Sequence, residues 1–139
     1  MTPTVTIGKA SIHNFTAISP VKVSRLPELC NETFCLLEQG KYNKAVNFFS
    51  IVIDICEKRH LVSTPVYALA HYGRGAATYH NMLAKGLSSE ILYKLAIESL
   101  ADLTLYHSLA PLHEDLHSSE AYLDSEKMME IIKKELGVN

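Results

Sequence analysis

The run HYGRGAATYH at residues 71–80 constrains the fold more than any other stretch of this chain. It places two glycines and two alanines within five positions of a segment whose flanks are typical of a helix. A glycine inside a helix lowers its stability by about 1 kcal/mol relative to alanine. Gly75, Ala76 and Ala77 cover a broad arc at about 100° per residue. We therefore expect a helix that lies between two neighbours, both of which approach its backbone closely.

Start and stop signals divide the rest of the chain into further helices. One helix begins after Pro27 and ends at Gly40, and a second spans about 43–59. Ser63-Thr64-Pro65 sets a hydroxyl cap before proline, which is typical of a helix start, and this helix carries the glycine run. Ser88-Ser89-Glu90 begins the next helix, which runs to about residue 109. The short connection at residues 40–43 indicates that the first two helices are antiparallel.

The last helix, over about residues 119–136, is amphipathic. Met128, Ile132 and Leu136 stack at four-residue spacing, Ile131 widens the stripe, and Gly137 ends the helix. We expect it to cap the last apolar face of the preceding hairpin. The sequence thus predicts an all-α fold of antiparallel helical hairpins without a sheet.

Residues 1–24 differ from this pattern, because they are rich in Thr, Ser, Val and Ile and show no helical period. We expect an extended N-terminal arm over residues 1–24, which becomes ordered against a partner, and a single helical domain over residues 25–139.

Composition excludes several classes of function. A net charge of −2 argues against a nucleic-acid binder. No apolar stretch reaches the ~18 residues of a membrane span, and the N-terminus has no signal-peptide pattern. Three cysteines, an odd number without CxxC spacing, favour a reducing compartment. We expect a cytoplasmic or nuclear protein that contacts neither nucleic acid nor membrane; its oligomeric state stays open.

The two hairpins share a pattern that resembles the tetratricopeptide repeat (TPR) superfamily over roughly residues 26–110. In both, a tyrosine precedes an alanine by three residues (Tyr42 and Ala45; Tyr93 and Ala96). The stretch QGKYNKA at residues 39–45 is similar to the turn between the two helices of that repeat, and GAATY at residues 75–79 to its small-residue stretch. The second unit departs from the family, because its turn is several residues too long.

The resemblance implies a non-enzymatic adaptor or scaffold subunit without a cofactor, which binds a helical or extended protein segment. The first helix of each hairpin would line an apolar, aromatic groove. The partner-binding residues that follow from this are Phe34, Leu37, Tyr72, Arg74, Tyr79 and His80. An alternative is that the arm or the final helix fills the groove from within.

Part of the chain also resembles, more narrowly, interrupted-TPR histone chaperones of the nuclear autoantigenic sperm protein type. It rests on the pair Tyr72-Gly73, the small residues that follow, and an interruption at residues 83–91. The interruption here is short and carries one lysine and one glutamate, unlike an acidic histone-binding insert. This alternative predicts salt-sensitive binding to histones that neutral proteins do not share.

The sequence HEDLH at residues 113–117 matches the HExxH pattern of zinc hydrolases. Helical spacing would place His113 and His117 on one face, with Glu114 beside a bound water. Against this reading, Asp115 is charged where that family is normally uncharged, and no sheet edge precedes the motif. A polar linker after Pro111 is the simpler interpretation, so we expect neither a metal site nor catalysis.

Overall fold

The computed structural model describes residues 23–138 and is all-α over that range. After a short 3-10 turn at Val23–Arg25, the helices are α2 (Leu26–Glu38), α3 (Tyr42–Lys58), α4 (Pro65–Met82), α5 (Ser89–Leu109), α6 (Glu114–His117) and α7 (Glu120–Leu136), with a second 3-10 turn at Ala110–Leu112. The predicted fold class is therefore confirmed for the described residues. The two short elements between α5 and α7 were not predicted.

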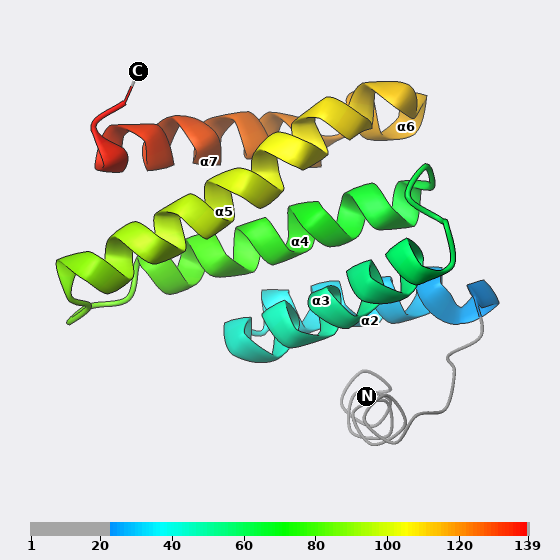
Figure 1. Cartoon of the computed structure of the whole chain (residues 1–139), viewed down its shortest axis with the longest axis horizontal. Coiled ribbons are helices and arrows are strands. Elements are labelled where there is room, and N and C mark those ends of the chain that lie inside the picture. Colours follow the sequence, from blue (N-terminus) through cyan, green and yellow to red (C-terminus); the bar gives the residue numbers. More distant parts are fainter. Residues whose placement is uncertain (1–22, 139) are drawn as a thin grey trace.

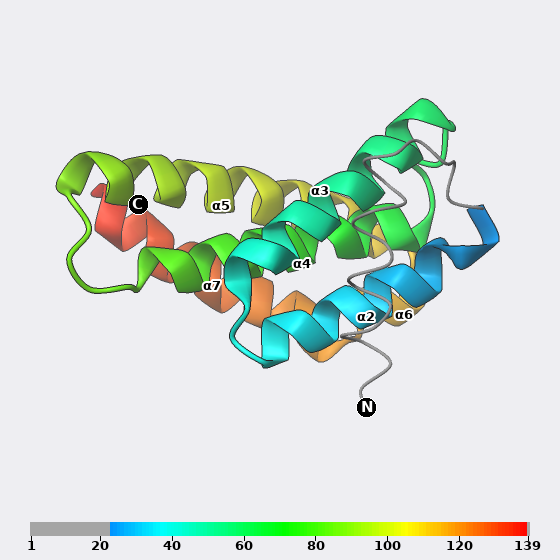
Figure 2. The same cartoon turned by 90° about the horizontal axis from the view of Figure 1, so that it is seen from below.

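The helices form antiparallel hairpins around α4 (Figure 1). α2 and α3 make the first hairpin, α4 and α5 the second, and α7 runs along the second hairpin. α4 packs mainly against α3 and α5 and more lightly against α2 and α7. Figure 2 shows α3 and α5 on one side of α4 and α2 and α7 on the other. Neighbouring helices thus cover two opposite long faces of α4, one facing α3 and α5 and the other facing α2 and α7.

Most helix ends follow the sequence signals. The Thr64 hydroxyl accepts a hydrogen bond from the backbone N–H of Tyr67, and the Ser88 hydroxyl accepts one from Ile91. Both residues have extended backbone angles, as expected for residues that cap a helix start. Gly137 ends α7 in the left-handed conformation at φ 74°, which glycine adopts without a Cβ penalty.

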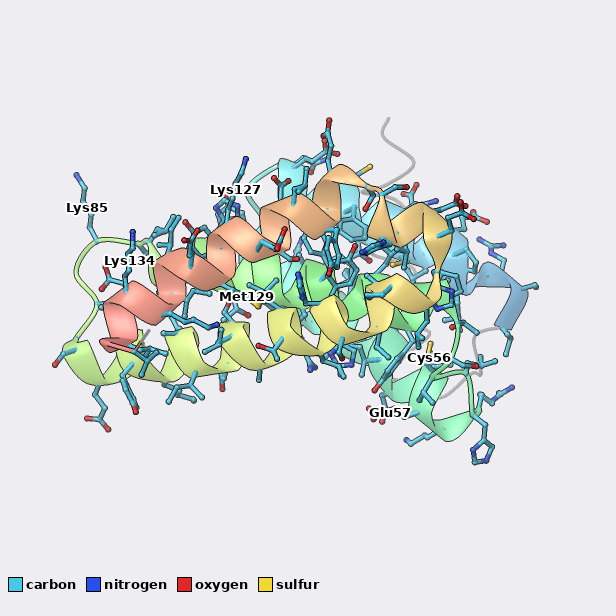
Figure 3. The ribbon with its side chains drawn as sticks, turned by 90° about the horizontal axis from the view of Figure 1, so that it is seen from above. Cys56, Glu57, Lys85, Lys127, Met129 and Lys134 are labelled. Carbon is cyan, nitrogen blue, oxygen red and sulfur yellow. The ribbon has the colours of Figure 1, made fainter. Side chains whose placement is uncertain are left out.

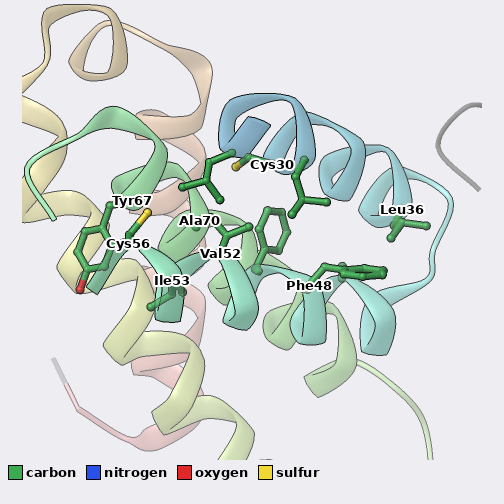
Figure 4. Close-up of a cluster of buried hydrophobic side chains, with 13 residues drawn as sticks. Cys30, Leu36, Phe48, Val52, Ile53, Cys56, Tyr67 and Ala70 are labelled. Carbon is green, nitrogen blue, oxygen red and sulfur yellow. The ribbon is translucent and has the colours of Figure 1, made fainter. Parts of the chain in front are cut away.

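The main core lies between α2, α3 and the first half of α4 (Figure 4). Phe49, Val52 and Cys56 of α3 are fully buried at its centre. They share one face of α3 because their spacing of three and four residues matches the helical period. Tyr67 and Ala70 of α4 close the cluster from the other side.

The small residues of α4 are buried and lie against large side chains of both neighbours. A Cβ atom at Gly73 would overlap the ring of Phe49 on α3. A Cβ atom at Gly75 would lie 2.9 Å from the Leu103 side chain on α5. The two glycines therefore face different helices, as expected for a helix that lies between two neighbours.

α7 packs on the second hairpin through Met128 and Ile132, which are buried together with Leu103. Leu136 packs against this cluster at its edge. The expectation that Ile131 belongs to the buried stripe is wrong, because this side chain is 43% exposed.

The predicted arm over residues 1–24 falls mainly outside the described residues. Its last two residues, Val23 and Ser24, belong to the first 3-10 turn rather than to an extended segment. Within residues 23–138, no helix is both long and apolar enough to cross a membrane.

Candidate functional site

Two of the expected groove residues stack across the interface of α2 and α4. The rings of Phe34 and Tyr72 lie 6.0 Å apart at an interplanar angle of 29°. Both residues are half-buried. Tyr72 also contacts Tyr106 of α5 at 5.1 Å between ring centroids, and burial raises the pKa of the Tyr72 hydroxyl to about 12. The two rings therefore belong partly to the core and partly to the surface.

A second aromatic group lies toward the C-terminal end of α4. His80 stacks on Tyr42 of α3 with centroids 4.9 Å apart and an angle of 11°. Tyr79 meets the same imidazole edge-on at 5.5 Å. His80 is exposed as a whole, yet desolvation of its ring lowers the pKa of the imidazole. The predicted residues Tyr79 and His80 thus form a continuous aromatic contact with the first hairpin.

α7 shares in covering this side of α4. Leu37, Tyr72 and Tyr79 pack against the cluster that contains Met128 and Ile132 of α7. We call the half-buried residues Phe34, Leu37, Tyr72 and Tyr79, together with the exposed His80, the aromatic surface. Only part of this surface is open, since the final helix takes up the rest.

Arg74 does not belong to the aromatic surface, although the sequence placed it there. It lies on the opposite long face of α4, toward α3 and α5. Its Nε donates to Oδ2 of Asp102 at 2.8 Å and its Nη2 to Oδ1 at 2.9 Å. Its Nη1 donates to the Ser50 hydroxyl at 3.1 Å. The guanidinium therefore joins three helices through one bidentate ion pair and one hydrogen bond.

Asp102 is the centre of this network. Nδ1 of His71 lies 2.7 Å from Oδ1 of Asp102, and both side chains are more than nine-tenths buried. Burial raises the pKa of Asp102, but the hydrogen bonds and charges of His71 and Arg74 outweigh it and lower the pKa overall. The carboxylate is therefore ionised, and the His71 Nδ1–H donates to it. Nε2 of His71 is buried without a hydrogen-bond partner among the described residues.

A hollow of about 390 Å³ opens beside the network, on the face of α4 between α3 and α5. Its lining consists of Val46 and Ser50 of α3, Arg74 and Thr78 of α4, and Glu98, Ala101 and Asp102 of α5. The Thr78 side chain is buried and forms no side-chain hydrogen bond within the described part of the chain. Small side chains on all three helices keep this space open.

The HEDLH segment does not have the geometry of a zinc hydrolase helix. His113 precedes the four-residue helix α6 in extended conformation, so it does not share a helical face with His117. The rings of His117 and Tyr122 instead meet in an edge-on contact at 4.8 Å, and His107 stacks on Tyr122 at 4.2 Å. Over residues 23–138, no cluster of three or more His, Cys, Asp or Glu side chains could hold a metal ion.

The three cysteines are unpaired, and two of them are buried. Burial raises the pKa of the Cys30 thiol to about 12, and the nearby Cys56 adds to this effect. Burial also raises the pKa of Cys56. A thiol that stays protonated is a poor nucleophile and metal ligand, so Cys30 and Cys56 act as core residues.

Sequence reasoning missed His71, Asp102 and Ser50. One signal was present in the sequence. Asp102 shares a face of α5 with Ser99, Leu103 and Tyr106, which is the buried face. A buried carboxylate needs a charged or hydrogen-bonding partner. The partner could not be identified, because Arg74 is 28 residues away and the register between α4 and α5 was unknown.

No protein-family model, curated protein or solved structure matches this chain. The TPR resemblance therefore stays a prediction. We infer the function from the geometry of the described residues.

Proposed function

We propose that this chain is a non-enzymatic protein-interaction module, which binds a helical or extended segment of a partner across the aromatic surface. The observation that carries the proposal is that two groups of aromatic contacts, Phe34 with Tyr72 and His80 with Tyr42 and Tyr79, reach the surface of α2, α3 and α4. Aromatic side chains dominate the binding energy of protein interfaces. They do so because each buries a large area while few torsion angles are lost.

The rings on this surface are held in place before a partner arrives. Tyr72 lies between Phe34 and Tyr106, and His80 lies against Tyr42 and Tyr79. Side chains that neighbours already hold lose little conformational entropy on binding, so more of the contact energy remains as affinity.

The order of the helices also supports a TPR-like reading. In that family the first helices of successive hairpins line one face, and here these would be α2, α4 and α7. In Figure 2, α2 and α7 lie on the same side of α4. A partner segment would then occupy the part of the aromatic surface that α7 leaves open.

The test compares three forms of the full chain as bait in affinity capture from a lysate, with quantitative mass spectrometry. The forms are the wild type, the double variant Tyr79→Ala/His80→Ala, and Tyr93→Ala. Tyr93 is a matched control, because it is a tyrosine that is 58% exposed on α5, away from the aromatic surface. We expect a set of proteins that wild type and Tyr93→Ala retain and the double variant loses.

Overlapping synthetic peptides from the strongest retained protein then locate the bound segment by fluorescence anisotropy. Loss of one aromatic anchor at an interface weakens binding by roughly 30-fold or more. An identical protein set for the wild type and a folded double variant contradicts the proposal.

A further inference from the structure

We propose that the hollow between α3, α4 and α5 is a second recognition site, which binds a basic polypeptide segment. In it a lysine or arginine side chain of the partner pairs with Glu98, and a main-chain carbonyl of the same segment accepts a hydrogen bond from Arg74. This site is independent of the aromatic surface, because it lies on the opposite long face of α4.

The charge around the hollow favours a cation. Asp102 neutralises Arg74 through two hydrogen bonds. Glu98 lines the hollow, is exposed, and forms no ion pair within residues 23–138. The hydrogen bonds to Asp102 are the main reason why the pKa of Arg74 is raised, and the negative charge of Glu57 adds to this effect. The charged residues that line the hollow are two carboxylates, Glu98 and Asp102, and one guanidinium, Arg74. A phosphate or carboxylate ligand therefore meets repulsion, and an ammonium or guanidinium group meets attraction.

The distribution of lysines strengthens this contrast. Figure 3 labels Lys85 in the loop before α5 and Lys127 and Lys134 on α7, far from Glu57 at the end of α3. These three lysines do not line the hollow. Lys44 of α3 and Lys94 of α5 also lie outside the lining, so Arg74 is the one cation that lines the hollow within residues 23–138.

The floor of the hollow has unused hydrogen-bond donors. A guanidinium has five N–H groups, and the hydrogen bonds of Arg74 to Asp102 and Ser50 use three of them. Arg74 lines the hollow and its side chain is 28% exposed, so a ligand in the hollow can reach the guanidinium. Because Asp102 already balances the charge of Arg74, a neutral acceptor such as a peptide carbonyl suits it better than an anion.

The walls suit the aliphatic part of a basic side chain. Val46 on α3 and Ala101 on α5 face the hollow and offer apolar contact. A lysine or arginine stem can pack along such a surface while its charged end reaches Glu98. The hydroxyl oxygen of Thr78 offers a further acceptor at the floor.

The experiment uses the full chain and a fluorescein-labelled peptide of alternating lysine and alanine, with a glutamate–alanine peptide of equal length as control. Anisotropy titrations at low salt give the Kd. We expect saturable binding of the lysine peptide only. Ala101→Trp fills the hollow from an exposed position, and we expect it to weaken binding about tenfold or more. Glu98→Gln removes one solvent-exposed ion pair, and we expect it to weaken binding about two- to fivefold.

Two control variants show whether a change in binding comes from the hollow itself or from the loss of any carboxylate or the addition of any bulky side chain. Glu130→Gln removes an exposed carboxylate from α7, and Ala84→Trp adds the same bulk in the loop after α4. We expect both to bind the lysine peptide like the wild type. Backbone amide shifts of the wild type on titration give a readout without any substitution, and they should concentrate at Thr78, Ala101 and Asp102.

Equal binding of the lysine peptide by a folded Ala101→Trp variant overturns the proposal, as does equal binding of the glutamate peptide. Amide shifts that lie elsewhere, or no saturable binding at all, also overturn it. The Tyr79→Ala/His80→Ala variant should bind the lysine peptide like the wild type. Binding of this peptide is therefore expected even if the aromatic surface binds no partner.

Discussion

The ring of Phe49 on α3 fills the space into which a side chain at Gly73 on α4 would project. Phe49 is fully buried and its ring packs against Phe34 in an edge-on contact at 4.8 Å, so a displaced ring would press on its neighbours. Gly73→Ala should therefore destabilise the fold, although alanine has the higher helix propensity. Overpacking costs about 1–3 kcal/mol and the propensity gain is about 1 kcal/mol, which leaves a net loss of up to about 2 kcal/mol. Urea denaturation followed by circular dichroism measures this change.

Asn47→Ala is the control for this substitution. Asn47 is exposed on α3, so the variant gains helix propensity without a clash. We expect its stability to be unchanged or slightly raised. If Gly73→Ala were as stable as Asn47→Ala, the contact between Phe49 and the α4 backbone would be absent in solution.

Gly75→Leu tests the other side of α4. A Cβ atom there would lie 2.9 Å from Cγ and Cδ2 of Leu103 and 3.1 Å from Cβ of Asp102, before the rest of the leucine is added. We expect destabilisation by about 1–3 kcal/mol through overpacking, measured by the same denaturation experiment. Asn47→Leu adds the same side chain at an exposed position and should be near neutral. A neutral or stabilising result for Gly75→Leu would show that α5 is not packed on this position.

The glycine run shows how far the sequence alone could determine the fold. Glycine and alanine within one helix predicted close neighbours on two sides, and the caps at Thr64 and Ser88 placed helix starts correctly. These features are local, so short-range sequence patterns contain them. Which side chain fills the space at Gly73 was not predictable, because the register between α3 and α4 depends on tertiary packing.

The hollow and its ion network could not be predicted from the sequence, because they too depend on the register between helices. Arg74 was expected beside Tyr72 and Tyr79, but two residues along a helix turn the side chain by roughly 200°, onto the opposite face. His71, Arg74 and Asp102 come together only when α4 and α5 are aligned. The aromatic residues could be selected by residue type alone, because aromatic side chains are enriched at interfaces. Their role in binding a partner stays a prediction.

Asp102→Ala should strongly destabilise the fold, because it leaves His71 and Arg74 without their common partner. We expect a loss of about 2–4 kcal/mol, in the lower part of the range for buried ion pairs, since Arg74 is partly solvated. The control is Asp54→Ala, which removes an exposed ion pair with Lys58 of 3.0 Å on α3. That loss should stay within about 0.5 kcal/mol. Similar losses in the two variants would contradict a stabilising role for the buried network.

The lowered pKa of Asp102 predicts that the unfolding free energy depends on pH. The pKa of Asp102 in the folded state is lowered below its ordinary value of 3.8, so the unfolded state takes up the proton first as the pH falls. The stability that Asp102 contributes is complete well above pH 3.8 and is lost as the pH drops through the folded pKa. The difference in unfolding free energy between wild type and Asp102→Asn should therefore be smaller at a pH of about 3 than at about 5. A difference that is constant between these pH values would show that the pKa of Asp102 is not lowered.

The thiols should react in two kinetic classes. Cys35 is half-buried, whereas Cys30 and Cys56 are buried and have raised pKa values, to about 12 for Cys30. At a pH of about 8, an aromatic disulfide reagent such as DTNB attacks only accessible thiolates. We expect one thiol of the native chain to react rapidly and the other two at the rate of unfolding, with all three reacting at once in denaturant. Cys35→Ser should remove the rapid phase, and a rapid phase that persists in this variant would mean that Cys30 or Cys56 is not buried in solution.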